Sequence, residues 1–254
     1  MAELKTDLHT HSADDPRDDL AYSSEMLIDA AAQLNYQVLA LTCHDGIMAT
    51  ERLAAYARRR GILLVPGIEA SIEGKHVVIL NADAEQASAG TFNEVRALGR
   101  RDAAFIAPHP YYPSMESLGR VLEANIDLFD AIEYCSFYFR WAGFNRKAVR
   151  IARKYGLPLI GTSDVHMFPY HDSTHARLEA APVVADVVAA IRQGRVALET
   201  RPRTLLEGIR PLMVSLRHVW RTYAGSSAGP SEKKTVSGRT PRKPGPLTQG
   251  DKCP

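Results

Sequence analysis

Two histidines stand on alternate positions near the start of the chain, in the stretch DLHTHS at residues 7–12. In a β-strand the side chains at i and i+2 point to the same face, so His9 and His11 would lie side by side. Imidazole is the commonest metal ligand in proteins, and two converging rings form the first half of a metal site. An isolated pair of this kind is more often simply exposed, so the other ligand-type residues have to distinguish the two interpretations.

Further histidines and carboxylates recur at the ends of the predicted strands. Apolar and β-branched runs typical of strands occupy residues 4–8, 37–41, 62–65, 76–80, 103–107, 131–134 and 157–160. Ligand-type residues follow five of these runs, and His76 opens another. The residues that follow a run are His9, His11, His44, Asp45, Glu69, His109, Asp164 and His166. Active sites of α/β barrels assemble at the carboxyl ends of the strands. Six of the nine histidines fit this pattern, so we predict a metal centre there.

Helical patterns separate the predicted strands. Residues 23–35, 49–61 and 145–156 have helical periodicity, and the last two stretches contain Arg or Lys shortly before a final Gly, as helix C-termini often do. Alternating strands and helices of this kind indicate an α/β fold with a mostly parallel sheet, either open or closed into a barrel.

The C-terminal part of the chain differs in composition. Residues 203–224 have an amphipathic helical pattern, within which Pro211 should cause a kink or begin a second helix. Residues 225–254 are rich in Gly, Pro, Ser and Lys, and we expect no independent fold there. The sequence thus predicts a domain at residues 1–202, a helix at 203–224 and a basic disordered tail at 225–254. The tail would make weak contact with nucleic acid at most, and a solvated end is the favoured interpretation.

Composition restricts the class of protein. The chain has 254 residues, of which 45% are hydrophobic, enough for one large α/β barrel. No apolar run approaches the roughly 18 residues that span a bilayer, and the first residues lack the apolar region of a secretory signal. Cys43, Cys135 and Cys253 are too few and scattered for a disulfide framework. We therefore expect a cytoplasmic protein with reduced thiols and no membrane span, whose oligomeric state the sequence does not determine.

Five motifs together resemble those of a known superfamily. DLHTHS, LTCHD, PGIEAS, APHP and GTSDVH are similar, in the same order, to the motifs of the PHP (polymerase and histidinol phosphatase) superfamily over about residues 5–200. The resemblance implies a distorted (β/α)7 barrel with two or three divalent ions, for which Zn, Mn and Fe all suit the ligand types. It also implies the ligand sets: His9, His11, Glu69 and Asp164 for one ion, Glu69 as a bridge to a second ion on His76 and His109, and His44, His166 and a loop acid for a third.

Two positions leave this ligand set open. The loop SADDPRDDL offers Asp14, Asp15, Asp18 and Asp19, among which the spacing favours Asp18, with Asp15 next. Cys43 stands where the family often has Asp or Asn. We interpret it as an inert small residue rather than an extra soft ligand.

Hydrolysis of a phosphate ester is the favoured function. Clustered divalent ions suit this reaction, and we expect a hydroxide that bridges two ions to attack the phosphorus of a small phosphorylated metabolite or nucleotide, as a monoester or a diester. The catalytic residues would be Glu69, His44, Asp164 and His166. Lys75 and Arg140 are candidate substrate-binding cations, although ordinary exposed charges are an equally good interpretation of both.

Two alternatives remain from other classes of function. One is an amidohydrolase-like, metal-dependent hydrolase of C–N or C–O bonds, against which the additional His44, His76 and Glu69 count. The other is a catalytically idle, metal-binding docking module. A complete ligand set counts against it, because an idle module has no chemical need for open metal positions.

Overall fold

The computed structural model describes residues 3–15, 17–205 and 207. The chain divides into two compact units at residues 1–211 and 212–254, and all described residues belong to the first. Most of the helix predicted at residues 203–224, and all of the tail predicted at 225–254, lie outside the described residues, so both stay predictions. Among the described residues, no helix has the length and apolar character to cross a membrane.

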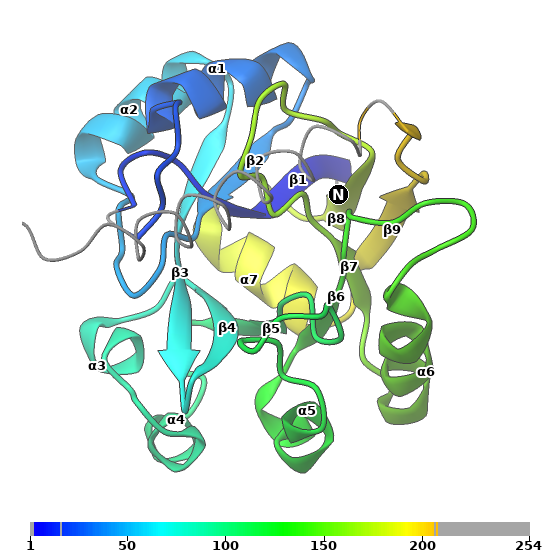
Figure 1. Cartoon of the computed structure of the whole chain (residues 1–254). Helices are drawn as coiled ribbons and strands as arrows, with labels where there is room; N and C mark the ends of the chain where they lie inside the picture. The colour runs from blue at the N-terminus through cyan, green and yellow to red at the C-terminus, as the bar shows by residue number, and fades with distance from the viewer. Residues whose placement is uncertain (1–2, 16, 206, 208–254) are drawn as a thin grey trace, which may run out of the picture. The chain divides into compact units, whose positions relative to one another are not determined.

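One curved sheet forms the centre of the first unit (Figure 1). Its strands follow the order β7-β6-β5-β4-β3-β2-β1-β8-β9. Their bounds are β1 Glu3–Thr10, β2 Val38–Leu41, β3 Leu63–Ile72, β4 Lys75–Leu80, β5 Ala104–Ala107, β6 Ala131–Tyr134, β7 Leu159–Gly161, β8 Thr174–Glu179 and β9 Val196–Thr200. The two end strands, β7 and β9, contact each other, so the sheet is a nearly closed barrel. The predicted class, a distorted α/β barrel, is confirmed.

Closure of the barrel depends on a glycine in β7. A Cβ atom added to Gly161 would lie 2.4 Å from the carbonyl oxygen of His175 in β8. Only glycine permits this close approach of two backbones. The final residue of β7 is therefore set by packing against β8.

The strand directions differ from the sequence prediction. The pairs β1–β2, β2–β3, β5–β6 and β6–β7 are parallel, whereas β3–β4, β4–β5, β1–β8 and β8–β9 are antiparallel. The expectation of a mostly parallel sheet is wrong. The main reason is a two-residue turn at Glu73 and Gly74, with φ values of 49° and 71°, which reverses the chain between β3 and β4. Two residues with positive φ are typical of the type I′ turn that joins antiparallel strands.

The seven predicted strands are all present, and all but β6 have shifted ends. The largest shift is in β3, which continues from residue 63 to residue 72 instead of ending at residue 65. Glu69 therefore lies within a strand rather than in the loop after it. Strands β8 and β9 are additional to the prediction.

Helices cover the outside of the barrel (Figure 1). Their bounds are α1 Ser24–Gln33, α2 Glu51–Arg59, α3 Ala84–Ala87, α4 Phe92–Leu98, α5 Val121–Ala124, α6 Asn145–Tyr155 and α7 Val184–Arg192, with a 3-10 turn at Ile126–Leu128. Helices α1, α2 and α6 are the three predicted helices. Ser23 and Thr50 cap the N-termini of α1 and α2, and Gly156 ends α6 in the left-handed conformation with φ 68°.

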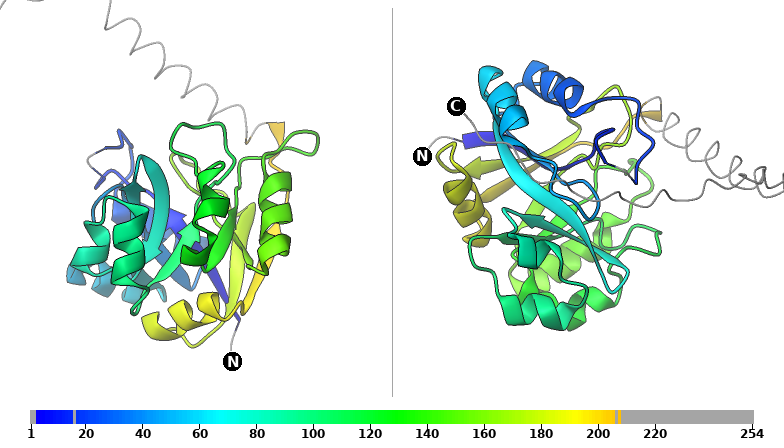
Figure 2. Two further views of the ribbon diagram at one scale, coloured as in Figure 1. Left: turned by 90° about the horizontal axis from the view of Figure 1, so that it is seen from below. Right: turned by 90° about the vertical axis from the view of Figure 1, so that its left-hand side faces the viewer.

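The barrel interior is apolar and closed at one end by α7. Leu4, Val38, Ala104 and Ala131, near the beginnings of their strands, belong to the same buried cluster as Val187 and Ile191 of α7. Figure 2 shows α7 at the end of the barrel where β1 begins. The opposite end, where the parallel strands finish, is left for the ligand-type residues.

Candidate metal centre

The ligand-type residues meet at the end of the barrel opposite α7. His9 and His11 lie at the end of β1, His44 follows β2, and His109 follows β5. His76 is near the beginning of β4, which reaches the same end of the barrel because β4 runs antiparallel to its neighbours.

Backbone contacts hold the loops of the centre in place. The amide of Asp164 donates to the carbonyl oxygen of His9 (3.0 Å), and the amide of Glu69 donates to that of Cys43 (3.2 Å). His109 and Asp164 have positive φ values, 24° and 48°. Such values are uncommon for residues other than glycine and persist only where neighbouring structure enforces them, often at functional sites.

Four side-chain atoms form the first candidate ion site. The Nε2 atoms of His9 and His11 each lie 3.3 Å from Oε2 of Glu69, and they lie 3.5 and 3.4 Å from Oδ1 of Asp164. Ligands placed about 2.1 Å from a tetrahedrally coordinated zinc ion are separated by about 3.4 Å. The spacing of these four atoms therefore fits one divalent ion.

The second oxygen of Glu69 faces other histidines. Its Oε1 atom lies 2.8 Å from Nδ1 of His76 and 3.1 Å from Nε2 of His109. The carboxylate is buried, with a side-chain exposure of 1%. A carboxylate whose two oxygens face separate groups of imidazoles has the arrangement needed to bridge two cations.

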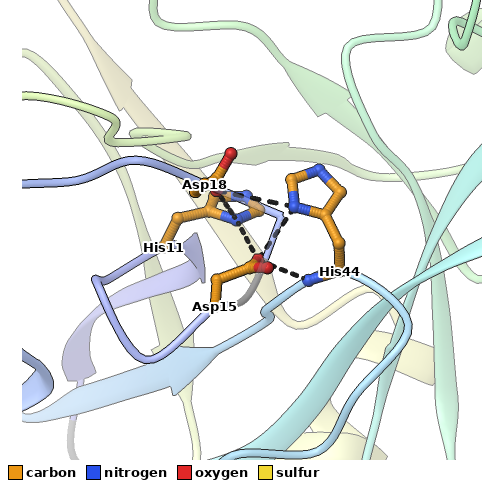
Figure 3. Close-up of side chains that lie close together, drawn as sticks. All are labelled: His11, Asp15, Asp18 and His44. Atoms are coloured by element: carbon orange, nitrogen blue, oxygen red, sulfur yellow. Dashed lines mark hydrogen bonds and ion pairs between the residues drawn. The ribbon is translucent and has the colours of Figure 1, made fainter. Parts of the chain in front are cut away.

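A third group surrounds the loop after β1. Oδ2 of Asp18 lies 3.3 Å from Nδ1 of His11, 3.5 Å from Nδ1 of His44 and 3.5 Å from Nε2 of His166. Oδ2 of Asp15 lies 2.8 Å from Nδ1 of His44 and also accepts that residue's backbone amide. Figure 3 shows the side chains of His11, Asp15, Asp18 and His44 pointing toward one another.

The structure separates the four loop acids that the sequence leaves open. Asp15 and Asp18 both reach the cluster. Asp14 is exposed and accepts a hydrogen bond from Ser24, and Asp19 is exposed. His166 joins the third group through Asp18, and its ring stacks on that of His11 with centroids 4.4 Å apart.

Several ligand atoms have no hydrogen-bond partner within the described residues. The buried atoms concerned are His9 Nε2, His11 Nδ1 and Nε2, Asp18 Oδ2, both ring nitrogens of His76 and Asp164 Oδ1. A buried polar atom without a partner is costly, so such atoms usually have an occupant between them. Imidazole nitrogens and carboxylate oxygens are the donors preferred by Zn, Mn and Fe. These residues therefore fit divalent cations.

Charges within the cluster shift the pKa values of its members. Burial alone would lower the pKa of His9, but Glu69, Asp164 and Glu133 hold it well above its usual value. The same balance of burial against nearby carboxylates raises the pKa of His109 to about 9. Burial would raise the pKa of Glu69, yet the surrounding histidines lower it well below its usual value. A cation entering the cluster therefore has to displace protons from the rings.

Two carboxylates missed by sequence reasoning position His9. Oε2 of Glu133, in β6, lies 2.7 Å from His9 Nδ1, and both side chains are fully buried. Oδ1 of Asp7 accepts the backbone amides of Ser163 (3.0 Å) and His9 (3.4 Å). Carboxylates that contact the far nitrogen of a ligand histidine fix its tautomer and orientation. The available signals were a charge within the short buried run AIEY and the first residue of DLHTHS.

A third missed residue is Arg203. Its Nη2 donates to Oγ of Ser136 (2.8 Å), and that hydroxyl donates to the carbonyl oxygen of Ser163 (2.7 Å), next to Asp164. Its Nε is buried without a hydrogen-bond partner, and no carboxylate forms an ion pair with it among the described residues. Burial lowers the pKa of this guanidinium. Arg203 follows the end of β9, just as most of the ligands follow the ends of their strands. It could not be found in this way because β9 was not predicted.

The remaining candidates, Lys75, Arg140 and Cys43, do not contribute atoms to the ligand cluster. Lys75 precedes His76, and its Nζ donates to the carbonyl oxygen of Met115 (2.6 Å). Arg140 is exposed in the loop after β6, and the structure does not bring it among the ligands. Burial raises the pKa of Cys43 to about 11, so its thiol stays protonated at neutral pH, which fits the interpretation of an inert residue.

Comparisons with known proteins agree with this fold. Residues 142–196 match the family PHP_C, described as PHP-associated, and no curated protein matches the chain. A two-domain protein from Bacteroides vulgatus containing a predicted PHP-like metal-dependent phosphoesterase is 19% identical, with a TM-score of 0.61 over 84% of this chain and 69% of that one. PsfC from Pseudomonas syringae is 18% identical, with a TM-score of 0.62 over 88% of this chain and 100% of that one. The lesion-specific endonuclease PfuEndoQ from Pyrococcus furiosus is 15% identical, with a TM-score of 0.55 over 78% and 58%. The chain is therefore similar to PHP proteins in two respects, a PHP-associated segment at residues 142–196 and a barrel fold shared with PHP-like structures.

Proposed function

We propose that the protein is a metal-dependent phosphoesterase that hydrolyses a small phosphorylated metabolite or a nucleotide. The observation that carries this proposal is the buried Glu69, whose two oxygens face separate groups of histidines. Divalent ions bound there would supply hydroxide near neutral pH and neutralise the charge of a phosphoryl group. Because uncatalysed phosphate monoester hydrolysis is extremely slow, clustered cations suit this reaction.

The chain's own residues would hold and orient the reacting groups. Glu133 and Asp7 fix His9, and Glu69 would offset the repulsion between two bound cations. Arg203 presents a guanidinium without a carboxylate partner among the described residues, and guanidinium groups bind phosphoryl oxygens through two parallel hydrogen bonds. His166, with a side chain 41% exposed, lies at the open side of the cluster, where a substrate would enter.

Arg203 also bears on the alternative functions. A guanidinium beside the metal ligands strengthens the binding of a charged phosphate, whereas it adds little to the binding of an uncharged amide. An idle docking module would gain nothing from a partly buried arginine that has no ion-pair partner in the described part of the chain. Both comparisons favour the phosphoesterase.

The test is a reconstitution experiment with the purified protein. Metal-free protein is loaded separately with Zn, Mn or Fe and assayed against an aryl phosphate monoester, an aryl phosphate diester and a set of aryl amides. We expect hydrolysis of at least one phosphate ester, abolished by a chelator and restored by metal. Arg203→Met should raise KM for that ester by about 10-fold or more, as expected for the loss of a charge-assisted contact worth about 1.5–3 kcal/mol. Hydrolysis of amides alone would contradict the proposal.

A further inference from the structure

An open groove of about 570 Å³ lies between the loop after β6 and the beginning of α6. Its lining is mainly aromatic and basic, and includes Tyr134, Tyr138, Phe139, Arg140, Trp141 and Arg146. Trp141 is 77% exposed, an unusual position for a large apolar ring in a soluble domain. The volume falls within the range of small-molecule sites, about 300–1,000 Å³.

A series of aromatic rings connects this groove to Tyr112, in the loop that follows the ligand His109. Tyr112, three residues after the ligand His109, lies 6.1 Å from Phe137, measured between ring centroids. Phe137 lies 5.8 Å from Phe139, which stacks on Trp141 at 5.6 Å with an interplanar angle of 14°. The guanidinium of Arg203 lies over the ring of Phe137, 5.3 Å from its centroid. The rings thus lead from the candidate phosphate-binding arginine to the solvent.

The same region carries a local excess of positive charge, although Lys154 of α6 pairs with Glu123. Helix α6 has the sequence NRKAVRIARKY, with five basic residues and no acidic one. Within the described ranges, Arg140 and Arg146 of the groove have no ion-pair partner. This concentration is local, because residues 1–224 together carry 25 basic and 27 acidic side chains, a net charge of −2.

We propose that the groove binds the bases and phosphates of single-stranded nucleic acid whose end enters the metal centre. Exposed aromatic faces that stack on unpaired bases, beside cations that contact the backbone, are the usual means of binding single strands. The bases of a duplex are already stacked and paired, so a ring such as Trp141 gains nothing from them. This inference rests on the proposed function and specifies its substrate as an oligonucleotide end.

Binding can be measured separately from hydrolysis. The full-length, metal-loaded protein is titrated with a fluorescein-labelled, single-stranded 10-mer that carries non-hydrolysable linkages, at several salt concentrations. Three variants are compared with wild type: Trp141→Ala, Arg140→Met and Arg58→Met. Arg58 is an exposed arginine on α2, on the other side of the barrel from α6, and serves as the control (Figure 1).

We expect salt-dependent binding by wild type and by Arg58→Met. Loss of one stacked base should weaken binding of Trp141→Ala by roughly 5- to 150-fold. Arg140→Met should reduce the slope of log affinity against log salt by about 0.7, as for one lost phosphate contact on a single strand. The ratio of kcat/KM for a natural oligonucleotide to that for an aryl phosphate should fall in Trp141→Ala.

The outcomes separate this inference from the proposed function. If wild type hydrolyses an aryl phosphate but binds no oligonucleotide at low salt, the groove proposal is wrong and the proposed function stands. Oligonucleotide binding that depends on Trp141, without hydrolysis of any phosphate ester, leaves the groove in place and removes the proposed function. If poly-glutamate competes as well as the oligonucleotide and Trp141→Ala changes nothing, the region is only a basic surface and the proposal is overturned.

Discussion

Replacing Glu133 by Gln tests whether this buried carboxylate tunes the metal centre through His9. The substitution keeps the size of the side chain and an oxygen near Nδ1 of His9, 2.7 Å away in the structure, but removes the negative charge. A hydrogen bond to a charged group contributes about 1.5–3 kcal/mol, and a neutral one about 0.5–1.5 kcal/mol. The difference, about 1–1.5 kcal/mol, corresponds to a roughly 10-fold weaker affinity of the centre for a metal ion. This loss lies at the lower end of the roughly 10- to 100-fold loss of metal affinity or activity that is usual when a residue orienting a metal ligand is replaced.

The assay is competition for Zn or Mn against a chelator of known affinity, with circular dichroism to check the fold. We expect Glu133→Gln to stay folded, bind the ion about 10-fold more weakly and lose a similar factor in turnover. Glu199→Gln is the matched control, because Oε2 of Glu199 lies 2.9 Å from Nε2 of His175, a histidine outside the cluster. Equal metal affinity and turnover in Glu133→Gln, Glu199→Gln and wild type would refute the orienting role of Glu133.

Three further predictions concern the cluster and the tail. Glu69→Gln removes the shared anion of two candidate ion sites, so at least one metal per chain should be lost and activity should fall near background in a folded barrel; elemental analysis showing full metal content, with normal turnover, would contradict this. The pKa of His109 is raised to about 9 without metal, so stabilisation by its protonated ring is complete below about pH 6.5 and is lost as the pH rises toward 9. Metal binding strengthens over the same range, because fewer protons compete with the metal for the rings. Calorimetry should therefore show the Tm difference between metal-loaded and metal-free protein widening from pH 6 to 9. A constant difference would show that protons and metal do not compete for the rings. Deleting residues 225–254 should leave hydrolysis of a small substrate unchanged, and lost activity would show that the tail supports the site.

The candidate centre was accessible from the sequence because its signals are local. Five of the seven predicted strands are followed by a histidine or carboxylate within a few residues, as His44 follows residues 38–41. Since parallel strands in a barrel finish at the same end, knowing where the strands end is enough to predict which side chains converge. The choice between Asp15 and Asp18 was beyond that rule, because a loop's path depends on contacts such as the one between Asp15 and the amide of His44.

The residues missed by sequence reasoning depend on contacts distant in the chain. Glu133 and His9 are 124 residues apart, and the charge within the buried run AIEY, although unusual, does not indicate which residue Glu133 contacts. Strand β9 has the sequence VALET and is mostly exposed or half-buried, so it lacks the apolar run that reveals the other strands. Without β9, the position of Arg203 at the site end of the barrel could not be inferred.

The direction of β4 was only partly predictable, because the position of His76 is visible in the sequence whereas the turn length depends on β3, which was predicted to end at residue 65 and continues to residue 72. If β4 were parallel to its neighbours, His76 near its beginning would lie at the end of the barrel closed by α7, away from every other ligand. Only an antiparallel β4 places His76 beside Glu69, where Nδ1 and Oε1 lie 2.8 Å apart. The pair Glu73 and Gly74 leaves just two residues between β3 and β4, too few for a parallel crossover, which needs about a dozen. The ligand chemistry and the turn length therefore both require a reversed strand, and together they outweigh the general expectation that strand and helix alternation gives a parallel sheet.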